Sequence, residues 1–162
     1  MAVKTMEDLF IETLKDIYYA EKQILKALPG MIKKAGDAKL RTALETHRQE
    51  TEGHIGRIEQ VFTIMDVPAR AKKCDAIEGI LAEAKQHMDE IEDGKVRDAG
   101  MIGSAQAVEH YEITRYGTLI AWARQLGHGD AVKLLEANLK EEKNADALLT
   151  KIADASVNQK AA

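Results

Sequence analysis

The chain has 162 residues, a length that suits one domain with a sizeable core. Hydrophobic residues make up 45% and charged residues 31%, and the two prolines and 4% aromatic residues favour helices over a sheet. The net charge of −4 gives no basic surface for nucleic acid, and no apolar run approaches the roughly 20 residues that span a membrane. Acidic residues at positions 7 and 8 argue against a signal peptide, and Cys74 is the single cysteine, so we expect a cytoplasmic protein without an intrachain disulfide.

The first predicted helix covers about residues 5–35. Thr5 and Asp8 resemble a capping box at its start, and Pro29 predicts a kink without ending the helical pattern. Apolar residues recur at alternating steps of four and three along one face, which is typical of a helix packed in a bundle. Glu21 is the one charged residue on that inward face.

The second helix is predicted over about residues 38–65. His47, Glu50 and His54 share its inward side near the middle, at spacings of three and four. A long connection follows, and its apolar periodicity predicts a short amphipathic helix over about residues 75–92. That helix is long enough to carry the chain back along a bundle, so we interpret it as a crossover on the bundle surface.

Two further helices complete the prediction. The third long helix covers about residues 96–126 and places Glu109 and Glu112 on its inward face, one turn apart. The fourth covers about residues 130–155 and also has two acids at its centre. The polar residues 156–162 are expected to fray.

Each of the four long helices therefore carries ionisable residues near the midpoint of its inward face. With a crossover between the second and third, these midpoints meet at one level of the bundle. Six of the residues are acids and no Lys or Arg shares their faces, so protons or metal cations must balance the charge, and two divalent ions accept such oxygen and imidazole ligands. Each of the two histidines is explained nearly as well by a hydrogen-bonded core position, and Tyr116 is interpreted as core packing. The candidate metal ligands are Glu21, His47, Glu50, His54, Glu109, Glu112, Glu142 and Asp146.

Several stretches resemble the YciE/YciF family of bacterial ferritin-like metal-binding proteins, within the ferritin-like superfamily. They are DIYYAEKQ at 16–23, HRQETEG at 47–53, VEHYEI at 108–113, YGTL at 116–119 and EEK at 141–143. The resemblance extends over nearly the whole chain. It implies one all-α domain, residues 1–162, folded as a ferritin-like four-helix bundle whose long crossover contains a short extra helix. It also implies a homodimer and a link to bacterial stress responses, without a settled activity.

The sequence departs from the superfamily's two-iron pattern in a way that affects the expected metal. That pattern has a histidine three residues after a glutamate on the second and fourth helices, where Gly53 follows Glu50 and Ala145 follows Glu142. Fewer imidazoles and more carboxylates favour iron or manganese over copper. The two missing side chains also leave room beside the metals.

We therefore expect a carboxylate-bridged pair of iron ions, with manganese as the alternative metal. Glu50 and Glu142 are the expected bridging residues. The expected partners are metal ions with dioxygen or hydrogen peroxide, and neither nucleic acid nor a membrane. Slow iron oxidation, peroxide scavenging or metal buffering would follow. The alternatives are a manganese-catalase-like enzyme and a structural or interaction dimer with a vestigial metal site.

Overall fold

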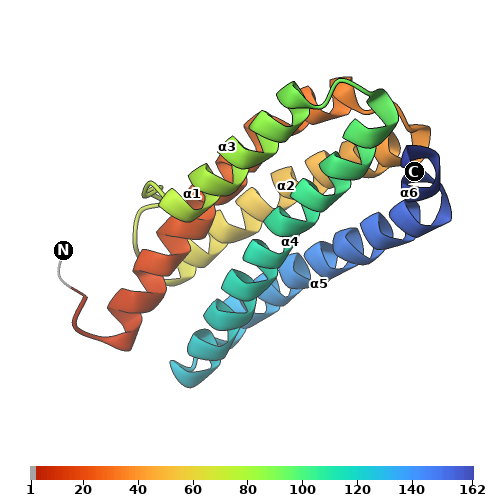
Figure 1. The fold of residues 1–162 in the computed structure, drawn as a ribbon. Helices are drawn as coiled ribbons and strands as arrows, with labels where there is room; N and C mark the ends of the chain where they lie inside the picture. Colours follow the sequence, from red (N-terminus) through yellow and green to blue (C-terminus); the bar gives the residue numbers. More distant parts are fainter. Residues whose placement is uncertain (1–2) are drawn as a thin grey trace.

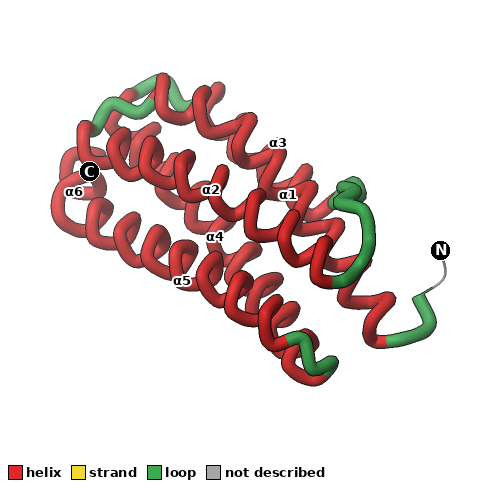
Figure 2. Tube along the Cα trace, turned by 180° about the vertical axis from the view of Figure 1, so that it is seen from behind, coloured by secondary structure: helices red, strands yellow, loops and turns green. Residues whose placement is uncertain are grey.

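The computed structural model describes residues 3–162, so the first two residues of the predicted domain lie outside the described range. The helices are α1 (Met6–Lys34), α2 (Ala38–Ile64), α3 (Asp75–Glu90), α4 (Gly94–Gln125) and α5 (Gly129–Ile152). A π-helical stretch, Ala153–Val157, and the short α6, Asn158–Ala161, follow α5 directly. Figure 2 shows helices joined by loops and no strand among the described residues.

Four long helices, α1, α2, α4 and α5, form an antiparallel bundle, and α3 lies along its outside (Figure 1). The α1–α2 turn and the C-terminus meet at one end, and the α4–α5 turn lies at the other. The α3 helix packs against α4 and α1 and carries the chain back between α2 and α4, as the crossover prediction requires. The predicted four-helix bundle with a crossover helix is confirmed. From residue 3 onward, no helix combines the length and apolarity needed to cross a membrane.

The helix starts follow from local side-chain chemistry. Thr5 and Asp8 form the predicted capping box at the start of α1, since each side chain accepts a hydrogen bond from the other's backbone N–H. Asp37 caps α2 by accepting from the N–H groups of Lys39 and Leu40. The α1 helix continues through Pro29 to Lys34, as predicted.

A buried aspartate fixes the turn between α1 and α2. Asp98 of α4 is 5% exposed, and its carboxylate accepts the backbone N–H of Gly36 at 2.9 Å and that of Asp37 at 2.7 Å. A Cβ atom on Gly36 would stand 3.1 Å from the Asp98 carboxylate, so this close approach favours glycine. The contact ties the first hairpin to the start of α4, which sets the level at which the inward faces of these helices meet.

The C-terminal prediction is wrong. Residues 156–162 were expected to fray, but the helical path continues to Ala161. Val157 is 1% exposed and belongs to the apolar core, and α6 packs against α4. One buried valine in an otherwise polar segment therefore anchors the end of the chain.

Candidate metal centre

A layer of polar side chains crosses the apolar core near the middle of the bundle. Its residues come from all four long helices, and each is between 0% and 6% exposed. They are Glu21 of α1, His47 and His54 of α2, Glu109 and Glu112 of α4, and Glu142 of α5. Above and below them the inward positions are filled by large apolar side chains, so water does not solvate this layer freely.

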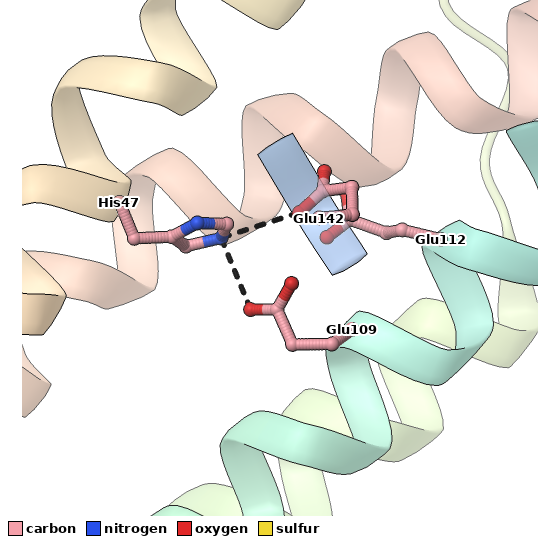
Figure 3. Close-up of side chains that lie close together, drawn as sticks. All are labelled: His47, Glu109, Glu112 and Glu142. Atoms are coloured by element: carbon pink, nitrogen blue, oxygen red, sulfur yellow. Dashed lines mark ion pairs between the residues drawn. The ribbon is translucent and has the colours of Figure 1, made fainter. Parts of the chain in front are cut away.

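One group within the layer consists of His47, Glu109, Glu112 and Glu142. Each offers one ligand atom, and these atoms lie within 4.8 Å of one another. Figure 3 shows the side chains converging from α2, α4 and α5. The Nε2 atom of His47 is 3.2 Å from Glu109 Oε1 and 3.8 Å from Glu142 Oε2. Four donor atoms of the types that bind transition metals thus surround one point.

A second group lies beside the first and consists of Glu21, His54 and Glu142, again with one ligand atom each within 4.8 Å. The Nδ1 atom of His54 is 3.2 Å from Glu21 Oε1 and 3.0 Å from Glu142 Oε1. Glu142 belongs to both groups and offers a different oxygen to each histidine. Its carboxylate is therefore placed to connect two neighbouring ligand sets.

Glu141 and Arg57 fix the orientation of the His54 ring through its Nε2 atom. Its Nε2 atom is 2.8 Å from Glu141 Oε2, and Arg57 donates to both Glu141 oxygens at 2.7 and 3.0 Å. Burial alone would raise the pKa of Glu141, but Arg57 and His54 lower it, so this carboxylate is the acceptor. Nε2 therefore carries a proton, and Nδ1 is the ring atom directed at Glu21 and Glu142.

A second polar chain supports Glu21. The hydroxyl of Tyr116, which is 0% exposed, donates a short hydrogen bond to Glu21 Oε1. Asn138 donates to the Tyr116 hydroxyl at 3.1 Å and accepts from Arg57 at 2.9 Å. Burial, together with the Glu21 carboxylate, raises the pKa of Tyr116 well above its ordinary value, so the phenol stays protonated and keeps donating. The two chains hold Glu21 and His54 in fixed orientations.

Most of the remaining polar atoms in the layer have no hydrogen-bond partner within the described residues. They are Glu21 Oε2, both ring nitrogens of His47, His54 Nδ1, Glu109 Oε2, and both carboxylate oxygens of Glu112 and of Glu142. Buried polar atoms are nearly always paired, so nine such atoms in one layer require an explanation.

A pair of metal ions, if bound, would give these atoms partners. Two ligand atoms that each lie about 2.1 Å from one metal ion, at angles of about 90–110°, are about 3.0–3.4 Å apart. Within the two groups, three of the four histidine–carboxylate separations are 3.0–3.2 Å, yet they lack the angles of hydrogen bonds. The four carboxylates of the two groups carry four negative charges, which equals the charge of two divalent cations. The residues present therefore fit a pair of divalent ions in spacing, donor type and charge.

Without metal, protons balance much of the same charge. Burial and the neighbouring Glu142 raise the pKa of Glu109 to about 11. The same two causes raise the pKa of Glu112 well above its ordinary value. Burial alone would lower the pKa of His54, but Glu21 and Glu142 raise it to about 11. Burial alone would raise the pKa of Glu142, but the adjacent His54 lowers it. The metal-free layer thus contains two protonated glutamic acids and a charged histidine facing an ionised Glu142.

The structure brings six of the eight sequence-predicted ligands together and leaves two outside. Glu50 lies at the edge of the layer, with its side chain 30% exposed and one oxygen 3.6 Å from His47 Nδ1. Asp146 turns toward α4, where it accepts from Gln106 at 3.1 Å and pairs with His110 at 3.2 Å. Glu50 and Glu142 were both expected to bridge the two metals. In the structure, Glu142 belongs to both ligand groups and Glu50 to neither.

The two small residues that were predicted to leave room beside the metals have different surroundings. Ala145 lines a cavity beside His47, described below. At Gly53, a Cβ atom would lie in ordinary van der Waals contact with the guanidinium of Arg57, at 3.9 Å, so Arg57 borders the space beside this residue.

Sequence reasoning missed the residues that hold the ligands in place. Glu141, Arg57 and Asn138 were not named as site residues, and Tyr116 was interpreted as packing. Asn138 could have been found, because it lies three residues after Leu135 and four before Glu142 on the inward face. The pairing of Arg57 with Glu141 joins α2 to α5 across 84 positions and leaves no pattern in either helix alone.

Comparison with known proteins gives relatives of nearly the same length. Protein YciF of Escherichia coli K12 is 45% identical over 162 residues, covering 99% of this chain and 98% of that protein. The crystal structure of the E. coli stress protein YciF matches with a TM-score of 0.92 and 44% identity, covering 96% of this chain and 99% of that one. The structure of YcfI from Rhodopseudomonas palustris matches with a TM-score of 0.90 and 50% identity, covering 91% of this chain and 94% of that one. That protein is described provisionally as a structural protein.

A protein from Xanthomonas campestris pv. campestris shares the fold alone, with a TM-score of 0.77, 20% identity, and coverage of 96% of this chain and 95% of that one. The sequence profile described as "Domain of unknown function (DUF892)" matches residues 5–162. The chain therefore belongs to the DUF892 family, and E. coli YciF is one of its relatives.

Proposed function

We propose that this protein binds two divalent metal ions, iron in the first place and manganese as the alternative, at the polar layer of its ferritin-like bundle. One ion would be held by His47, Glu109 and Glu112, the other by Glu21 and His54, and Glu142 would serve both. The observation that carries the proposal is the set of unpartnered buried donor atoms converging from all four long helices of the described chain. Four carboxylates with two imidazoles make a hard donor set, which suits iron and manganese better than copper.

Metal analysis of protein purified without chelator tests the proposal. We expect two ions per chain, and we expect Glu142→Gln to lose most of them because both ligand sets share that carboxylate. Glu52→Gln is the matched control, since Glu52 is an exposed glutamate on α2. Equal metal content in the two variants would contradict the assignment.

If metal is bound, the proposed chemistry is slow oxidation of iron. Two ferrous ions would supply the two electrons that, with two protons, reduce one hydrogen peroxide to two waters. Strongly donating carboxylates favour the ferric state and oppose its reduction, so we expect few turnovers and a role as a metal buffer or sacrificial peroxide scavenger. The description of the E. coli relative as a stress protein supports a stress-associated role.

The test of this chemistry is to load the protein anaerobically with two equivalents of ferrous ion, add peroxide or air, and follow ferric absorbance and turnover. Sustained turnover with an added reductant would favour an oxidase or peroxidase instead. Rapid dioxygen release from peroxide by the manganese-loaded protein would favour a manganese-catalase-like enzyme.

The second candidate is a structural protein with a vestigial metal site, assembled as a homodimer. The provisional description of the R. palustris relative favours it, and so does the balancing of charge by protons in the metal-free layer. Failure of the protein to take up ferrous or manganous ion, with a dimer seen by light scattering, is the result expected for this candidate.

A further inference from the structure

A cavity of about 100 Å³ opens beside His47, and its lining includes Glu50 and Glu109 but not Glu142. All five longer helices contribute to its lining, including Ala27 of α1, Leu81 of α3 and Ala145 of α5. Its exposed and half-buried lining residues include Thr46 and Glu50 of α2 with Leu148 of α5, so it reaches the surface along the α2–α5 contact. The proposed metal function requires no organic molecule in this space.

Most of the cavity wall is apolar. Leu28, Met31, Leu44 and Leu149 line it and are between 3% and 5% exposed. An apolar cavity of this kind gives water few hydrogen-bond partners and instead accepts small apolar guests, and a volume of 150 Å³ is enough for benzene. The enclosed volume near 100 Å³ is smaller than this, but the cavity continues to the surface, so we expect it to accept a guest no larger than about one six-membered ring.

One part of the wall is polar. His47, Glu50 and Glu109 line it together, and both ring nitrogens of His47 are buried without a hydrogen-bond partner within residues 3–162. The Nε2 atom faces Glu109 and Glu142, whereas Nδ1 lies 3.6 Å from Glu50 Oε2. That separation is too long for a hydrogen bond, but one hydroxyl oxygen at about 2.8 Å from each atom can bridge them. The hydroxyl would accept from Nδ1–H and donate to the Glu50 carboxylate.

We propose that this cavity binds a small neutral alcohol or phenol, with its hydroxyl between His47 and Glu50 and its apolar body against the leucine-lined wall. The inference deepens the proposed function, because it places a small organic molecule directly beside one ligand of the metal centre. A carboxylate guest is disfavoured, since its charge would face Glu50 and the acids of the layer.

The test uses phenol and the metal-free protein, so that it does not depend on the metal proposal. We expect phenol to bind, as followed by saturation-transfer NMR and by a rise in melting temperature, and benzoate to bind far more weakly. Ala145→Leu, which fills the cavity, should abolish phenol binding. Ala147→Leu is the matched control on the exposed side of α5 and should leave binding unchanged.

A second cavity-filling variant, Ala27→Leu, approaches from α1 and serves if Ala145→Leu does not fold. Phenol binding that survives cavity filling, or benzoate binding equal to that of phenol, would overturn the inference. Phenol binding by a protein that takes up no metal would support the cavity and refute the metal proposal, so the two failures are distinguishable.

Discussion

His54 is the candidate ligand whose position depends most on a neighbouring side chain. Its Nε2 atom is 2.8 Å from Glu141, which Arg57 holds through both oxygens. Partners of this kind orient a ligating ring and increase its basicity, and their loss typically costs about 10–100-fold in metal affinity. We therefore predict such a loss for Glu141→Gln in a competition titration against a chelator. Glu136→Gln, which removes an exposed ion pair of the same helix, should keep wild-type affinity. Equal affinities in the two variants would show that Glu141 does not support the site.

Glu112 and Glu142 should respond oppositely to replacement by leucine. Glu112 is 0% exposed, its carboxyl has no hydrogen-bond partner in the described chain, and its raised pKa keeps it neutral without metal. Burying such an unpaired group costs about 1–3 kcal/mol, so Glu112→Leu should raise the melting temperature of metal-free protein and abolish stabilisation by metal. Glu142→Leu instead removes the carboxylate nearest to Nδ1 of the charged His54 and leaves Glu21 as the one acid facing that atom, so it should lower the melting temperature. Calorimetry in the presence of chelator distinguishes the two directions, and a shift of the same sign in both variants contradicts the prediction.

At the scale of the helices, periodicity predicted the fold well because each inward face repeats at the helical period. The same period explains why Asp146, which was predicted to be a metal ligand, lies outside the two ligand groups. On α5, Glu142 points inward and Asp146 is rotated from it by about 40°, which is enough to turn its carboxylate toward Gln106 and His110.

On α2, the fully buried Thr51 takes the position between His47 and His54, and Glu50 is displaced to the edge of the layer. Local spacing identifies a face to within about one residue, whereas the choice of ligand depends on contacts between helices. The same limit explains why Arg57 and Glu141 were missed, because their pairing exists only once α2 and α5 are packed.

Asp98 gives a prediction at the level of the first hairpin. Its carboxylate accepts two backbone N–H groups of the α1–α2 turn, and it is 5% exposed. Hydrogen bonds to a charged group contribute about 1.5–3 kcal/mol each, so the loss of both in Asp98→Ala should destabilise the fold by about 3–6 kcal/mol. The melting temperature should fall by roughly 6–24 °C. Asp93→Ala, which removes the exposed N-cap of α4, should cost about 1 kcal/mol. A smaller loss at Asp98 than at Asp93 would contradict the role of the buried aspartate.

At the scale of the whole molecule, the bundle consists of apolar core with one polar layer across its middle. The acids of this layer oppose folding unless protons or cations neutralise them. Metal bound at the proposed site would compete with protons for the same groups, and the stability of the entire fold should then depend on which of them is bound.

The pKa shifts give this dependence a sign. Glu109 has a folded-state pKa of about 11, against an ordinary value of 4.5, and His54 has one of about 11 against 6.5. The pKa of Glu112 is also raised, well above its ordinary value. Above its ordinary pKa each group keeps its proton in the folded state and loses it on unfolding, so the stability of metal-free protein should fall as pH rises from 5 to 9. The pKa values of Glu12 and Asp89 are both lowered to about 2, so these two groups change stability only below about pH 5.

Metal binding should show the opposite trend over the same range, because each ion must displace these protons before it can be held. We therefore predict that the melting temperature in chelator decreases from pH 5 to pH 9 while the increase produced by manganous ion grows. Differential scanning calorimetry at a series of pH values, with chelator or with metal, measures both curves. The Glu112→Leu variant is the control, since it removes one of the titrating acids and should flatten the chelator curve. A melting temperature in chelator that rises with pH would mean that the buried acids are ionised in the metal-free protein, and that protons do not take the place of metal in the layer.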